Sequence, residues 1–164
     1  MASRSASLAA QAATVEPTPK AGPEHTRLSA FVGKWIAEGR TQAGPSGPGQ
    51  IMTHQHTYGW LPGGFHLFHR WDGLIGTHES KGIEIIGYDP ASQSYPCHFF
   101  DSDGWARVYQ GTVSDRVWTM AGERERCRIE FGDGGHTMTT HWDRSSDGVR
   151  WYPLCDVRMR KVSL

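Results

Sequence analysis

The stretch FVGKWIAEGRT, Phe31–Thr41, decides how the fold is interpreted. Successive side chains of a strand point to opposite faces, so one face of this stretch carries Gly33, Trp35, Ala37 and Gly39. A large indole among residues with almost no side chain packs poorly in a flat sheet, but it suits a strand that bends around a cavity. We therefore interpret the stretch as the first strand of a small antiparallel barrel, with the indole closing one end.

Further segments of alternating or β-branched character follow, separated by turns rich in Gly, Pro and Asp. They span residues 50–60, 65–74, 81–88, 94–100, 105–113, 116–122, 126–131, 136–144 and 151–162. The pattern predicts an all-β fold, a closed antiparallel up-and-down barrel of about ten strands, which leaves no exposed edge and has room for a small ligand. Residues 24–30 are predicted to form a short helical turn, and Leu28 and Phe31 would then cap the barrel end.

Composition narrows the classes of partner. The chain has 164 residues with 17 basic and 17 acidic side chains, so it lacks the positive charge that a nucleic-acid partner requires. No apolar run is long enough to cross a bilayer, and no membrane association is predicted. The three cysteines are far apart and odd in number, which favours free thiols and a cytoplasmic protein. Residues 1–23 are interpreted as a disordered arm and 24–164 as a single domain; whether the protein is a homodimer stays open.

Several blocks of the sequence resemble known proteins. Gly33-Lys34-Trp35 resembles the Gly-x-Trp opening of the calycin superfamily, which includes lipocalins and fatty-acid-binding proteins. LPGGF at 61–65, HRWD at 69–72 and GIEIIGYDP at 82–90 are similar, in this order, to blocks of the bacterial DUF1579 family. The resemblance runs from about residue 27 to residue 162 and implies a lipocalin-like barrel without an assigned activity.

The resemblance to lipocalins also implies a structural role for a late-strand arginine. In lipocalins such an arginine packs over the tryptophan of the Gly-x-Trp motif. Arg158 or Arg160 would take that position here, with Gly33 and Trp35 as the other structural residues.

The segment GKWIAEG at 33–39 is similar to the opening of nitrobindins, which are ten-stranded haem-binding barrels. Ala37 departs from the middle glycine of that motif. Nitrobindins take their iron ligand from a histidine close to the C-terminus, and no histidine follows His141 here. No cofactor is therefore predicted.

The histidines give the clearest indication of a site. His54 and His56 lie two apart in one predicted strand and share a face, although the alternation alone does not decide whether that face points inward. His69 lies on the mostly apolar face of the next strand, where a hairpin would bring it close to the first two. A cavity lined in this way suits a small, largely apolar or aromatic ligand. The predicted ligand-binding residues are His56, Tyr58, Leu67, Trp71, Tyr109, His136, Met138 and Trp142.

An enzyme is the second hypothesis for the same cavity. Imidazole titrates near neutral pH, so His69 and His54 are predicted as the catalytic residues of an isomerase or cyclase that acts on a small natural-product-like substrate. Glu84, Tyr58 or Tyr109 is the expected partner in moving a proton. A metal- or haem-dependent barrel is a weaker alternative, because no carboxylate falls in an obvious third-ligand pattern, and no metal ligands are assigned.

The remaining polar segments have local explanations. Asp101 and Asp103 belong to a turn motif. The run ERERCR, Glu123–Arg128, is interpreted as a solvated strand face. No nucleophile elbow or phosphate-binding loop occurs. The loops at residues 43–49 and 72–81 are predicted to form the mouth of the barrel.

Overall fold

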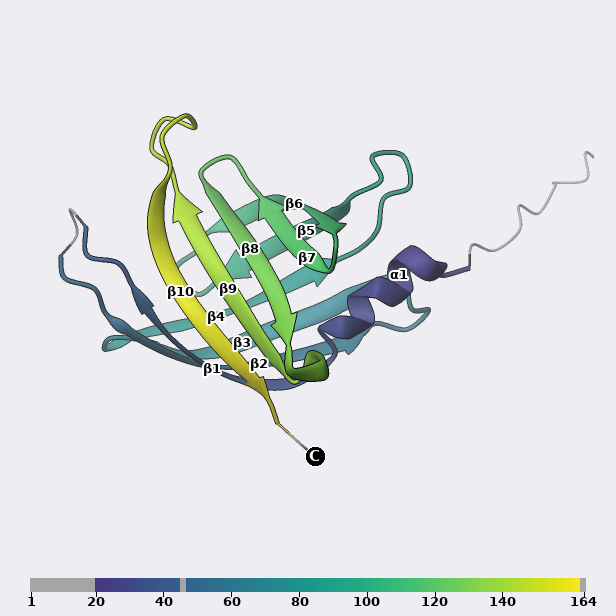
Figure 1. Cartoon of the computed structure of the whole chain (residues 1–164), viewed down its shortest axis with the longest axis horizontal. Helices are drawn as coiled ribbons and strands as arrows, with labels where there is room; N and C mark the ends of the chain where they lie inside the picture. Colours follow the sequence, from purple (N-terminus) through teal and green to yellow (C-terminus); the bar gives the residue numbers. More distant parts are fainter. Residues whose placement is uncertain (1–19, 45–46, 163–164) are drawn as a thin grey trace, which may run out of the picture.

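The computed structural model describes residues 20–44 and 47–162, where the chain forms a closed antiparallel barrel (Figure 1). Each strand pairs with its neighbours in the sequence, and the first strand closes the barrel against the last. The elements are α1 (Pro23–Arg27), η1 (Leu28–Ala30), β1 (Gly33–Thr41), β2 (Ile51–Trp60), β3 (Leu67–Ile75), β4 (His78–Ile86), β5 (Tyr95–Asp101), β6 (Ala106–Ser114), β7 (Val117–Ala121), β8 (Glu125–Gly132), η2 (Asp133–Gly135), β9 (Thr137–Arg144) and β10 (Tyr152–Lys161). The predicted fold class is confirmed. The predicted arm, residues 1–23, lies mostly outside the described residues.

Strand β2 shows how the alternation builds the wall of the barrel. Its inward positions are buried and its outward positions are exposed, in strict succession from Ile51 to Tyr58. The register with β1 places Trp35 opposite His56, and the register with β3 places Tyr58 opposite His69. The histidine face of β2 therefore points into the barrel.

One end of the barrel is closed by the segment that precedes β1 (Figure 1). Leu28, Phe31 and Trp35 are at most 1% exposed. The indole N–H of Trp35 donates to the carbonyl oxygen of Phe31 at 2.8 Å, and the hydroxyl of Tyr95 donates to the carbonyl oxygen of Glu24 at 3.0 Å. The short helices expected at residues 24–30 are thus held at the barrel end by the burial of Leu28 and by the hydrogen bond from Tyr95 of β5, while the bond from Trp35 fixes the residue that follows them.

The side chain that packs over the indole of Trp35 is a lysine and not one of the expected arginines. Arg158 and Arg160 are exposed on the outer face of β10, because the alternation places them opposite to the buried positions. Lys161 lies opposite Trp35 in the register, and its Nζ lies 4.8 Å from the centre of the indole ring. Gly33 has φ +133°, and a Cβ there would lie 3.2 Å from Cε of the lysine, so this position suits glycine.

Turns between strands surround the open end of the barrel. The turn between β3 and β4 is shorter than the loop expected at residues 72–81. Residues 72–81 are mostly strand, since β3 and β4 continue to a tight turn at Gly76 and Thr77. Gly76 takes φ +60°, which lets two regular strands meet in so short a connection. His78 Nε2 lies 3.0 Å from a carboxylate oxygen of Asp103, so this hairpin is linked to the turn between β5 and β6.

Candidate functional site

A cavity of about 350 Å³ lies inside the barrel, between the closed end and the rim. Phe31 forms its floor, and Asp103 and Trp105 lie at its rim. Most lining side chains are apolar or aromatic, and Trp71 stacks on Phe99 with ring centres 4.7 Å apart. The volume falls at the lower end of the range of about 300–1,000 Å³ that is typical of small-molecule sites.

Three side chains from adjacent strands form a hydrogen-bonded chain along one wall of this cavity. Glu84 Oε2 of β4 lies 2.9 Å from Nδ1 of His69 in β3, and Nε2 of the same ring lies 2.9 Å from Nδ1 of His56 in β2. Tyr58 stacks on His69 with ring centres 3.8 Å apart and a 6° interplanar angle. Since both nitrogens of His69 are occupied, the chain presents His56 to the cavity.

Burial sets the charge state of this wall. The pKa of His56 is lowered to about 2, because burial disfavours the imidazolium and charges on His69 and His54 would repel it. Burial also lowers the pKa of His54, against an opposing effect of Asp72. The pKa of Tyr58 is raised by burial and by the carboxylate of Glu84. At neutral pH, His56, His54 and Tyr58 are therefore uncharged.

Three polar atoms that face the cavity are buried and have no partner among the described residues. They are Nε2 of His54, Nε2 of His56 and Oγ1 of Thr140. The histidines lie together on β2, with ring centres 5.7 Å apart and nearly perpendicular, and the threonine lies on β9. Buried polar atoms nearly always find a hydrogen-bond partner, so these three mark where a ligand would be held.

A second polar cluster lies on the opposite strands and centres on a residue that sequence reasoning missed. Glu125 is only 7% exposed. Its carboxylate accepts hydrogen bonds from the hydroxyl of Tyr109 at 2.9 Å and from Arg144 Nη2 at 2.8 Å. Arg107 Nε lies 3.9 Å from the same carboxylate. The prediction that residues 123–128 form a solvated face is therefore wrong for Glu125. The available signal was the alternation, since Glu125 shares the inward parity of Cys127.

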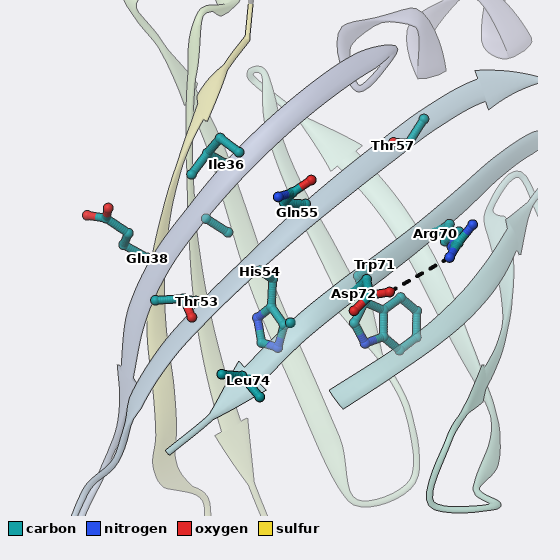
Figure 2. Close-up of a pocket in the computed structure, with 12 residues that line it drawn as sticks. Ile36, Glu38, Thr53, His54, Gln55, Thr57, Arg70, Trp71, Asp72 and Leu74 are labelled. Carbon is teal, nitrogen blue, oxygen red and sulfur yellow. Dashed lines mark ion pairs between the residues drawn. The ribbon is translucent and has the colours of Figure 1, made fainter. Parts of the chain in front are cut away.

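The outer wall carries a larger but open depression of about 670 Å³, shown in Figure 2. Its outer rim consists of exposed side chains of β1 to β3, such as Ile36, Gln55 and Leu74. Arg70 and Asp72 form a 3.7 Å ion pair there. Of the three residues with unpartnered buried atoms, only His54 also lines this depression (Figure 2), whereas all three line the inner cavity. The inner cavity is therefore the candidate site.

The structure brings most of the predicted site residues together around the inner cavity. Those that line it are His54, His56, Tyr58, His69, Trp71, Tyr109, Met138 and Trp142. Two do not. Leu67 is fully buried outside the lining, where β3 begins beside the closed end. His136 is exposed in the turn that follows η2, and its Nδ1 lies 2.9 Å from the carbonyl oxygen of Asp133, because β9 begins one residue later.

The thiols show no sign of reactivity. Cys97, Cys127 and Cys155 are free and buried, and burial raises the pKa of each, that of Cys155 to about 12.

Among the described residues, no cluster of three or more His, Cys, Asp or Glu side chains is arranged to hold a metal ion. In the same part of the chain, no helix has the length and apolar character of a membrane span.

Comparisons with solved structures support the barrel. Rv2717c from M. tuberculosis is similar with a TM-score of 0.65 at 10% identity, over 87% of this chain and 99% of that one. The S-type phycobiliprotein lyase CPES from Guillardia theta gives 0.50 at 10% identity, over 83% and 91%. At such identities the similarity concerns the fold alone.

Comparison with curated proteins finds no match. A family model, described as "Protein of unknown function (DUF1579)", matches residues 20–147, which include β1 to β9 and all three members of the hydrogen-bonded chain. The chain therefore belongs to the DUF1579 family.

Proposed function

We propose that the barrel binds a small, largely apolar or aromatic molecule in its inner cavity. The observation that carries this proposal is the set of unpartnered buried atoms on His54, His56 and Thr140, in a chamber whose other lining is mainly apolar. Leaving a buried donor or acceptor unpaired costs about 1–3 kcal/mol. A ligand that pairs with these atoms recovers that free energy while it buries its own apolar surface.

Tryptophan fluorescence tests the proposal, because Trp71, Trp105 and Trp142 all line the cavity. We expect saturable quenching by members of a panel of aromatic and acyl compounds. Thr140→Phe should fill part of the chamber and abolish the quenching. Thr139→Phe is the matched control, since Thr139 is the exposed neighbour on the same strand. Saturable binding to no member of the panel, or equal binding by both variants, would contradict the proposal.

An isomerase or cyclase is the second candidate, and the chain from Glu84 through His69 to His56 favours it. The geometry changes the expected assignment of roles. His69 is enclosed between two partners, so the group that would touch a substrate is His56, and His69 would be a positioning residue. On a substrate found in the panel, His56→Ala should lower turnover far more than affinity; equal losses would support binding alone.

The proposal also includes a cytoplasmic location and no nucleic-acid partner. Three free, buried thiols are what a reducing compartment favours. The zero formal charge, from 17 basic and 17 acidic residues, offers little attraction for a phosphate backbone.

A further inference from the structure

The hydrogen bonds along the cavity wall take one direction when Glu84 is ionised and His69 is neutral. An ionised carboxylate only accepts, so Nδ1 of His69 donates to Glu84. In the neutral ring, Nε2 of His69 then accepts, and Nδ1 of His56 donates to it. It follows that Nε2 of His56 carries a lone pair, and this is one of the atoms that have no partner.

We propose that the ligand of this cavity is a flat aromatic molecule with an acidic hydroxyl, of the phenol or enol type, whose O–H donates to Nε2 of His56. The inference rests on the proposed function and adds the chemical class of the ligand. A methyl ether, a ketone or a carboxylate offers His56 no proton. A carboxylate would also bring a second negative charge towards Glu84.

The surrounding side chains provide the rest of the recognition. Trp71 and Phe99 form a stacked pair on the cavity wall, which gives a planar ring an apolar surface to lie against. The two arginines near the rim are already engaged, since Arg144 bonds to Glu125 and Arg107 lies 3.6 Å from a carboxylate oxygen of Asp101. The unpaired polar atoms in the interior therefore favour a hydroxyl over an anionic group.

The chain also provides a place for the proton of that hydroxyl. As the O–H bond of the ligand breaks, a bond from its hydrogen to Nε2 of His56 forms. The hydrogen on Nδ1 of His56 moves to Nε2 of His69, and the ligand is left as an oxyanion. The positive charge then resides on His69, beside Glu84, while His56 stays neutral and donates to the oxyanion.

Five titratable groups close to this chain are held neutral by burial. Burial raises the pKa of the phenols and thiols that lie close enough to Glu84 to be affected by its charge. Burial also lowers the pKa of the neighbouring histidine, His54. These groups are His54 and Tyr58 from β2, Cys97 from β5, Tyr109 from β6 and Cys127 from β8. None of these five groups is therefore a charged acceptor that competes with the chain that ends at Glu84, and the other carboxylate in the cavity, Glu125, is already paired with Arg144.

Two coumarins test the inference, 7-hydroxycoumarin and its methyl ether 7-methoxycoumarin. We expect the hydroxy compound to bind about tenfold more tightly to the unmodified protein, or about 1.4 kcal/mol. The absorption band of its anion should also appear at lower pH when bound than when free. Both readouts use the natural chain, so they stand even if a variant fails to fold.

Two variants then assign the effect to a residue. His56→Phe should bring the ratio of the two affinities close to one and abolish the shift in ionisation. His98→Phe, a change of an exposed histidine on the outer face of β5, should leave both unchanged. Equal binding of the two coumarins by the natural chain overturns the inference and leaves the proposed function standing. Binding of neither counts against both, and a preference that survives His56→Phe overturns the role of His56.

Discussion

Gly82 of β4 illustrates how single residues shape the cavity. It lies opposite Trp71 in the register, and a Cβ at this position would overlap the six-membered ring of the indole. We expect Gly82→Ala to displace the ring and to lower the free energy of unfolding by about 1–3 kcal/mol. Urea denaturation followed by circular dichroism measures the change.

Gly59 of β2 is the matched control for this substitution. A Cβ there would meet no atom within 4 Å, so Gly59→Ala should leave stability unchanged or slightly raised. Equal losses in the two variants would show that the flexibility of glycine, and not the room under the indole, matters at position 82.

The carboxylate of Glu125 is expected to matter more for stability than its arginine partner. Glu125→Ala leaves the buried hydroxyl of Tyr109 without an acceptor, and we expect a loss of about 1–3 kcal/mol. Arg144→Ala should cost less, because the arginine side chain is 57% exposed and remains solvated when alone. Thermal unfolding of the two variants checks the order, and a larger loss for Arg144→Ala would contradict it.

At the scale of residues, the sequence predicts which side chains share one face of a strand better than it predicts which side chains they contact. The alternation of β2 places His54, His56 and Tyr58 on one face, and the barrel confirms that grouping. It does not predict that His69 has both ring nitrogens engaged, because a contact between β2, β3 and β4 depends on the register of three strands. Glu125 has the parity of Cys127, but the charged residues on either side of it favour a solvated face, which is how the segment 123–128 is interpreted from the sequence. The parity shared with Cys127 is the sequence signal for its burial, whereas its partners Tyr109 and Arg144 are visible only in the structure.

At the scale of elements, η1 is held by packing and not by its own helical character. A helix of three residues has no intrinsic stability, so its position depends on Leu28, which is fully buried. We expect Leu28→Ala to cost about 2–5 kcal/mol and to loosen the closed end of the barrel. Ser29→Ala, at the exposed next position, is the control for chemical denaturation. Similar unfolding midpoints for the two would contradict the proposed role of this cap.

The strands were predictable because each has its own alternation and is bounded by turn residues. Their ends were harder to predict. The turn at Gly76 and Thr77 has a single glycine as its sequence signal, so a loop over residues 72–81 is expected where the barrel has a turn of two residues. Likewise His136 was grouped with Met138, although the chain turns at η2 and the strand begins at Thr137. Hydrogen bonding between strands, which the sequence does not show, decides where each strand stops.

At the scale of the whole molecule, the buried histidines make stability depend on pH. In the unfolded chain an imidazole takes up a proton near pH 6.5, whereas His56 in the barrel stays neutral down to about pH 2. Between these values the unfolded state binds more protons, so stability is fully present above pH 6.5 and falls below it. We expect a loss on the order of 1–2 kcal/mol between pH 7 and pH 5, to which His54 adds in the same direction.

Denaturant titrations at the two pH values measure this loss, with two variants for comparison. His56→Phe should flatten the dependence, whereas His98→Phe, outside the barrel, should keep it. Equal slopes for the natural chain and His56→Phe would rule out His56 as the source.

The seam between β1 and β10 has a consequence for synthesis. Before β10 is available, β1 and β9 each lack a neighbour, because β10 pairs with both in the finished barrel. The cavity is enclosed only when β10 pairs with β1, and β10 is the last strand to be synthesised. Until then both edges are open to pairing with other chains, and this is when the protein most needs protection from aggregation.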